Sequence, residues 1–289
     1  MTKPFIKQKR FFPRSSDGSG RKRFFGHGEL PVDFLDEVSC FETLRVYAGR
    51  PFRLEEHCAR LGQSCAAIGK ALPCAPAELG RWLKEAVRES GFRGAIARLS
   101  VHWAASARTA LTAVLREFSG YPPSLYREGV VLKTTAQRRW TLKAQDPRIK
   151  ASQFVGGVLA FLEASGPRPH EFVFLNSAGT VAEGSVSNLF IVAGAKRLLT
   201  PSVSSGILRG VTRDVLIAVA KKKGFQVLET VLTRHEIYSA KECFMTNTSS
   251  EVLPVVRVDE RVIGQGAPGP VTRRLAAEFK KEVYRASAK

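Results

Sequence analysis

The sequence predicts an α+β protein of two domains, a small N-terminal α/β domain followed by a larger C-terminal domain. At 289 residues, of which 44% are hydrophobic, the chain is long enough to bury two cores. Stretches of alternating apolar residues, typical of strands, are mixed with stretches of helical apolar spacing. The segment 119–124, Ser-Gly-Tyr-Pro-Pro-Ser, breaks both patterns and is the best domain boundary.

The first 27 residues are strongly basic. They hold eight lysines and arginines against one aspartate, in a chain whose formal net charge is +19. No apolar periodicity persists through them, so we expect a basic flexible arm at 1–27. Such an arm is either a solvated tail or a contact for a polyanion such as nucleic acid.

The N-terminal domain is expected over 28–118 and opens with a strand at 40–47. A helix follows, because apolar residues recur on one side of the next segment. They are Leu54, Cys58, Leu61, Cys65 and Ile68. A second helix ends at Gly91 and has a similar apolar side, made of Leu79, Trp82, Leu83, Ala86 and Val87.

Two more strands complete this domain. Residues 95–103 alternate in character, which places Arg98 on the face opposite the main apolar residues. Residues 109–118 form the other strand. An interdomain linker is expected at 119–128, and the C-terminal domain over 129–289.

Lys150 is expected where a strand gives way to a helix. After it, apolar residues recur at helical spacing from Phe154 to Leu162, and the pattern stops at Gly166-Pro167. A lysine in this apolar context is a candidate for chemistry. In a chain with 45 lysines and arginines, an ordinary surface lysine is the alternative.

Glu183 is the matching carboxylate. A strand at 172–175, a turn at 176–179 and a return strand at 180–182 lead to it, and small residues and an apolar strand follow it. A close-packed position is therefore expected. Because an unpaired buried carboxylate is costly, Glu183 should have a partner.

Two helices are expected nearer the C-terminus. The segment 206–212 leads into a helix that stops at Gly224, and the N–H groups at its start can hold a phosphate. A capped surface helix is the alternative. A last amphipathic helix runs through Leu275, Phe279 and Val283, and its role is structural.

Several ordered motifs resemble the class IV aminotransferase family. They are 41–45 (FETLR), 57–61 (HCARL), 148–150 (RIK), 181–190 (VAEGSVSNLF), 199–201 (LTP), 206–213 (GILRGVTR) and 244–251 (FMTNTSSE). The resemblance runs from about Phe41 to the C-terminus. It implies a fold-type IV enzyme with a pseudo-barrel C-terminal domain, a pyridoxal 5'-phosphate cofactor and a homodimer.

The resemblance also implies roles for individual residues. Lys150 would form a covalent Schiff base with the cofactor and later move the substrate's α-proton. Glu183 would keep the pyridine nitrogen protonated. The residues expected to bind the cofactor phosphate are Arg60, Val211, Thr212 and Thr248. Phe41, Arg98 and Ser249 would contact the substrate.

Three of these assignments have structural alternatives. The alternative to phosphate binding by Arg60 is an exposed helix arginine. The alternative to substrate binding by Arg98 is a structural ion pair. The segment that carries Thr248 and Ser249 is otherwise a polar turn between two strands.

The subfamily is decided narrowly. The residues 41–43 and 187–190 favour the D-amino acid aminotransferases and aminodeoxychorismate lyases, whereas 248–251 and 268–272 favour the branched-chain enzymes. We predict an aminotransferase that acts on a branched-chain or similar hydrophobic amino acid and a 2-oxo acid. A basic nucleic-acid-binding protein on a decayed enzyme scaffold is the non-enzymatic alternative.

Composition indicates a cytoplasmic protein with neither a disulfide framework nor a metal site. No apolar run approaches the roughly 18 residues of a membrane span, and no secretory signal is evident. The five cysteines are odd in number and lack C-x-x-C spacing.

Overall fold

A computed structural model describes residues 8–13, 24–26, 38–103, 109–139, 149–151, 159–160, 162 and 169–288. The chain divides into two compact units, and the division falls between Ser119 and Gly120, inside the linker predicted at 119–128. Most of the helix predicted after Lys150 lies outside the described residues.

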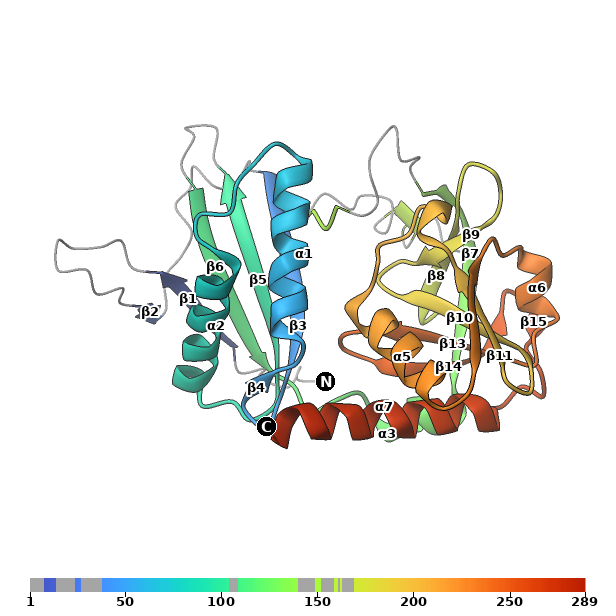
Figure 1. The fold of residues 1–289 in the computed structure, drawn as a ribbon. Coiled ribbons are helices and arrows are strands. Elements are labelled where there is room, and N and C mark those ends of the chain that lie inside the picture. Colours follow the sequence, from blue (N-terminus) through green and yellow to red (C-terminus); the bar gives the residue numbers. More distant parts are fainter. Residues whose placement is uncertain are drawn as a thin grey trace, which may run out of the picture. The chain divides into compact units, whose positions relative to one another are not determined.

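The first unit is built on a six-stranded sheet in the order β2-β1-β6-β5-β3-β4, with every pairing antiparallel. Its strands are β1 (Gln8–Pro13), β2 (Phe24–Gly26), β3 (Val38–Tyr47), β4 (Arg50–Pro51), β5 (Ala95–Trp103) and β6 (Thr109–Glu117). Helices α1 (Leu54–Ala67) and α2 (Pro76–Ser90) lie on one face of this sheet (Figure 1).

The core of this unit lies between the two helices and the sheet. The predicted apolar side of α1 is buried at Leu54, Cys58, Leu61 and Cys65, and that of α2 is buried along its length. Burial of such side chains stabilises the fold by about 1.5–3 kcal/mol each. The helices and strands predicted for this domain are therefore confirmed.

The N-terminal arm differs from its prediction. Instead of an arm without regular structure, residues 8–13 form β1, which pairs with β6 from Gln8 opposite Arg116 to Phe11 opposite Ala113. Backbone groups make this pairing, so no apolar periodicity is needed. The ammonium of Lys9 also lies 5.7 Å from the centre of the Phe92 ring.

Residues around Lys150 also depart from the predicted division. Residues 149–151 belong to the first unit, although they were predicted within the C-terminal domain. The Phe41 N–H donates to the Lys150 carbonyl at 2.9 Å, and Cys40 forms an isolated bridge with Ala151. These contacts attach the segment to β3.

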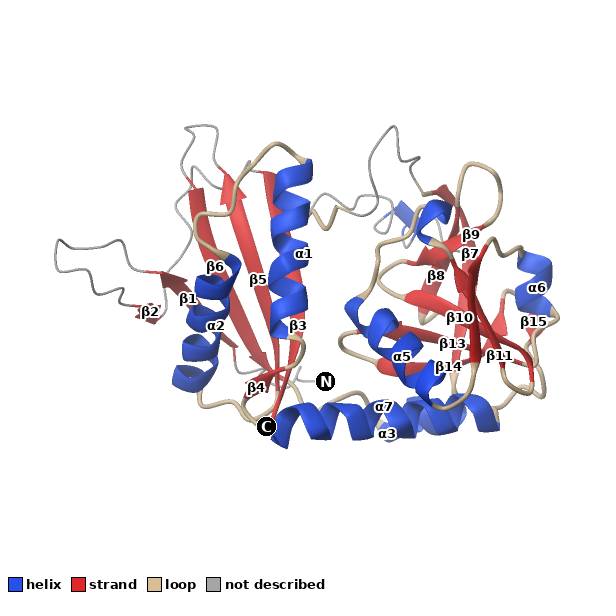
Figure 2. Cartoon of the chain, viewed as in Figure 1, coloured by secondary structure: helices blue, strands red, loops and turns tan. Residues whose placement is uncertain are grey.

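The second unit holds a nine-stranded mixed sheet. Its main path runs β12-β11-β10-β13-β14-β7-β8-β9, and β15 pairs with β14. The strands are β7 (Val130–Arg138), β8 (Glu171–Leu175), β9 (Val181–Gly184), β10 (Asn188–Gly194), β11 (Arg197–Pro201), β12 (Gln226–Thr230), β13 (Glu242–Asn247), β14 (Glu251–Val258) and β15 (Arg261–Val262). Figure 2 shows how strands dominate this unit.

Few helices accompany this sheet in the described residues. They include α3 (Pro123–Glu128), the 3-10 turn η2 (Val203–Ser205), α5 (Val211–Lys222), α6 (Arg234–Tyr238) and α7 (Pro270–Ala288). α3 occupies part of the predicted linker, since its prolines fall at helix-start positions. None of the described helices is both long and apolar enough to cross a membrane.

Candidate active site

Lys150 lies beside Phe41 in the first unit. Its Nζ is 4.7 Å from the centre of the Phe41 ring, and the guanidinium carbon of Arg98 is 3.7 Å from the same centre. The Lys150 N–H donates to Ser64 Oγ at 3.1 Å. The structure thus brings together three predicted site residues, and their two positive charges suit an anionic group such as a carboxylate.

Arg60 is held by a carboxylate that sequence reasoning missed. Its Nε lies 2.6 Å from Glu42 Oε1 and its Nη2 lies 2.7 Å from Glu42 Oε2, a two-point ion pair. His57 Nδ1 lies 2.8 Å from the same Oε2. Because the Arg60 side chain is only 12% exposed, it is not the solvent-facing arginine of the alternative interpretation.

The charges of this cluster follow from its burial. Burial alone would raise the pKa of Glu42. The opposing effects of Arg60 and then of His57 are together larger, so the pKa is lowered to about 2. Burial lowers the pKa of His57, and the charges of Arg60 and Lys150 lower it too, although the hydrogen bond to Glu42 and the charge of Glu42 act to raise it. Glu42 is therefore a carboxylate at neutral pH and fixes the direction of the Arg60 guanidinium. The sequence signal that could have identified Glu42 was its position in a strand, β3, whose residues are mostly buried.

Glu183 ends up buried in the second unit with the partner that the sequence required. Its Oε1 lies 2.6 Å from Arg139 Nη2, while its Oε2 accepts from Asn188 Nδ2 and from the Leu208 N–H, each at 3.1 Å. Arg139 follows β7, far from Glu183 in the sequence, so no local spacing could have identified it. The carboxylate is held from three directions.

The start of α5 is joined to this cluster. Asn188 Nδ2 also donates to the Leu208 carbonyl at 2.9 Å, and a side chain at Gly210 would overlap Asn188 Oδ1. No side chain caps the helix start, which leaves the N–H groups beside Val211 and Thr212 suited to an anion. Val211 and Thr212 are both buried.

Thr248 and Ser249 lie in a tight turn between β13 and β14. Asn247 Oδ1 accepts from the N–H and the hydroxyl of both Ser249 and Ser250, at 2.7–3.1 Å. Glu251 closes the turn in the left-handed region, with φ 59°. These hydrogen bonds hold the turn that carries Thr248 and Ser249 in one conformation.

The predicted residues therefore fall into two groups. Lys150, Phe41, Arg98 and Arg60 belong to the first unit, whereas Glu183, Val211, Thr212, Thr248 and Ser249 belong to the second. Within the described residues, no group of acidic, histidine and cysteine side chains has the arrangement of a metal site.

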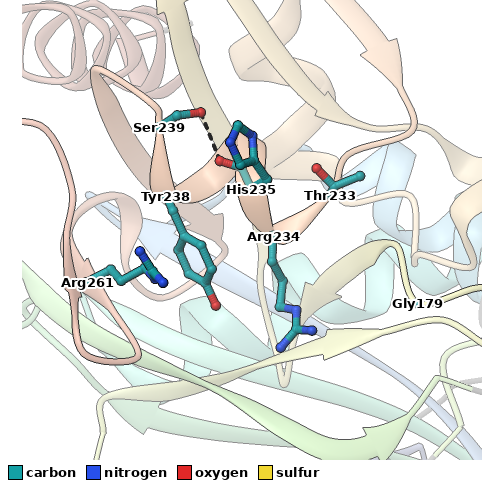
Figure 3. A pocket seen from close by; sticks show the side chains of 7 residues that line it. All are labelled: Gly179, Thr233, Arg234, His235, Tyr238, Ser239 and Arg261. Atoms are coloured by element: carbon teal, nitrogen blue, oxygen red, sulfur yellow. Dashed lines mark hydrogen bonds between the residues drawn. The ribbon is translucent and has the colours of Figure 1, made fainter.

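A separate hollow of about 740 Å³ lies elsewhere in the second unit (Figure 3). It is lined by Gly179, Thr233, Arg234, His235, Tyr238, Ser239 and Arg261. None of the predicted site residues borders it. The site is therefore defined by the anchored side chains rather than by this hollow.

Known proteins match the chain along most of its length. The Amino-transferase class IV family matches residues 39–258. A branched-chain-amino-acid aminotransferase of Pseudomonas aeruginosa is 30% identical over 84% of this chain and 83% of its own. A D-alanine aminotransferase of Bacillus licheniformis is 32% identical over 92% of this chain and 97% of its own.

A solved structure agrees with this match. The crystal structure of a branched-chain amino acid aminotransferase with pyridoxamine 5'-phosphate, from T.th., superposes with a TM-score of 0.84, at 30% identity, over 95% of this chain and 93% of that one. This similarity confirms the predicted two-domain, fold-type IV architecture. The chain belongs to the class IV aminotransferase family.

Proposed function

We propose that this class IV aminotransferase exchanges an amino group between a branched-chain or similar hydrophobic amino acid and a 2-oxo acid, with pyridoxal 5'-phosphate as its cofactor. The observation that carries the proposal is the anchored carboxylate of Glu183, held by Arg139, Asn188 and the Leu208 N–H. The substrate class rests on the branched-chain relatives.

The residues present fit this cofactor. Glu183 is a buried carboxylate with a fixed direction, as a partner for a pyridine nitrogen must be. The uncapped start of α5 offers backbone N–H groups for a phosphate. When bound, the cofactor supplies an aldehyde for attachment to a lysine amine and a ring that accepts electrons.

The chain's own residues supply the remaining chemistry. Lys150 Nζ takes the proton from the substrate's Cα. The backbone of Lys150 is hydrogen-bonded to Phe41 and Ser64, which fixes the position from which its side chain extends. Arg98 holds the substrate's carboxylate. Glu183, paired with Arg139, would stabilise a proton on the ring nitrogen of the bound cofactor. The working form is a cytoplasmic homodimer, as expected for the family.

A D-amino acid aminotransferase is the second candidate, favoured by the D-alanine relative. The test incubates the purified protein with L-leucine, L-valine or D-alanine and 2-oxoglutarate, and follows glutamate. Aminodeoxychorismate is supplied separately, and pyruvate is followed. Glutamate from the L-amino acids supports the proposal, whereas pyruvate from aminodeoxychorismate without any glutamate would show a lyase.

A further inference from the structure

A second buried carboxyl group lies behind Glu183. Glu171 is the first residue of β8 and is only 4% exposed. Its Oε1 accepts from the Val186 N–H at 2.6 Å and from Ser187 Oγ at 2.9 Å. Glu171 therefore binds the middle of the short turn that joins β9 to β10.

The two ends of this turn carry the anchored carboxylate and its amide partner. β9 holds Glu183 as its penultimate residue, and β10 begins with Asn188. Asn188 donates to Glu183 Oε2 at 3.1 Å. A shift of the turn would therefore move both members of this hydrogen bond.

The turn is packed tightly against Glu171. The Gly184 N–H donates to the Ser187 carbonyl at 2.8 Å, and the Ser185 N–H donates to the Phe172 carbonyl at 2.9 Å. A side chain at Gly184 would overlap Glu171 Oε1. The carboxyl group thus determines how closely the turn approaches β8.

The charge environment of Glu171 differs from that of Glu183. Burial chiefly, and then the negative charge of Glu183, raise the pKa of Glu171 to about 7, although its hydrogen bonds act to lower it. Among the described residues, the charged or titratable groups on the neighbouring segments are Glu183 on β9, Lys133 and Arg138 on β7, Arg139 after β7, and His170 directly before Glu171. Arg139 pairs with Glu183.

We propose that Glu171 is a positioning residue for the aminotransferase reaction: by holding the Val186 N–H and Ser187 Oγ, it sets the direction of Glu183 and Asn188. The inference rests on the proposed role of Glu183. The ionisation of Glu171 near neutral pH adds a negative charge behind Glu183. This charge strengthens the hold of Glu183 on a proton at the ring nitrogen.

The second unit offers a matched control in Glu242. This glutamate is also buried and also binds a backbone segment, since it accepts from the Val271 N–H at 3.0 Å and from the N–H and hydroxyl of Thr272 at 2.7 Å each. It belongs to β13 and binds the start of α7. A purely structural role should make the two glutamates behave alike.

The experiment compares Glu171→Ala, Glu171→Gln and Glu242→Ala as cofactor-loaded enzymes, by kcat, KM, the cofactor's absorption spectrum against pH, and the thermal unfolding midpoint. We expect Glu171→Ala to lower kcat by about 10-fold or more with little change in KM, since small misplacements in a site have effects up to about 100-fold. In the parent, the ionisation of Glu171 should change the cofactor's absorption spectrum near pH 7. Glu171→Gln should restore much of kcat but lose this spectral change.

The control decides between positioning and simple stability. Glu242→Ala should lower the unfolding midpoint at least as much as Glu171→Ala while keeping kcat within about 2-fold of the parent, as for a residue outside the site. Equal kcat losses for these two variants, or an unchanged spectral titration in Glu171→Gln, would overturn the inference. If the parent shows no transamination, the proposed function fails, and the spectral titration still tests Glu171 separately.

Discussion

Arg139 and Glu183 form a buried ion pair, with Nη2 and Oε1 2.6 Å apart and side chains that are 12% and 4% exposed. Such a pair is costly to break, because removal of one member leaves the other charge buried without compensation. The arginine therefore belongs, together with the glutamate, to the part of the site that we propose for the ring nitrogen.

Arg139→Met should destabilise the protein strongly. Loss of one member of a buried pair typically costs about 3–5 kcal/mol in the free energy of unfolding. Urea unfolding followed by fluorescence would measure the cost. Arg138→Met is the matched control, because Arg138 is exposed and donates to the carbonyls of Thr135 and Ala136. Similar losses in both variants would contradict the special cost of the pair.

Lys150→Ala should abolish both turnover and covalent attachment of the cofactor, because it removes the amine that we propose forms the Schiff base and moves the substrate's α-proton. Borohydride reduction of the loaded parent, followed by peptide mapping, should place the label on Lys150. Lys196→Ala, which removes an exposed lysine of the second unit, should retain both properties. A label on a different lysine would refute the assignment.

Glu42→Gln should change the acid stability of the protein. The pKa of Glu42 is lowered in the folded state from 4.5 to about 2, so its contribution is present above about pH 4.5 and is lost as pH falls towards 2. A shift of this size corresponds to about 3 kcal/mol of unfolding free energy.

The measurement is the unfolding free energy at several pH values between 2 and 7. The parent should lose stability steeply between pH 4.5 and 2, and the Glu42→Gln curve should be flatter there. Glu55→Gln, an exposed change on α1, is the control and should follow the parent. A Glu42→Gln curve parallel to that of the parent would show that the pKa of Glu42 is not lowered by folding.

Removal of residues 1–27 should leave the chemistry intact but expose an edge of the first sheet, because β1 covers β6. An uncovered edge strand invites pairing between chains. We expect a lower thermal midpoint and concentration-dependent association, measured by light scattering, together with weaker binding to heparin. Removal of residues 1–7 alone is the control, since it leaves β1 in place. Loss of cofactor binding in the longer truncation would mean that the catalytic domain starts earlier than we infer.

Local patterns predicted most of the secondary structure because local forces determine it. The alternation over 95–103 became β5 with the same bounds, and the apolar stripe after residue 53 became the buried side of α1. The strand at 8–13 was not predicted, for the converse reason. β1 is held by backbone pairing with β6, and backbone groups leave no trace in composition.

The candidate site was only partly predictable. Motifs identified Lys150, Glu183 and Arg60, but they did not identify what holds these residues in place. Glu42 and Arg139 are each paired with a predicted residue through contacts between distant segments. Such partners are decided by the tertiary fold, so a single sequence carries little information about them.

The contact between Gly210 and Asn188 constrains which substitutions this chain can accept. A side chain at 210 would overlap Asn188 Oδ1, and a shorter residue at 188 would give up the hydrogen bond to Glu183 Oε2. Neither position can change alone without cost to the carboxylate. Among descendants of this chain, glycine at 210 and asparagine at 188 should be inherited together, and lineages that lose one should soon lose the other.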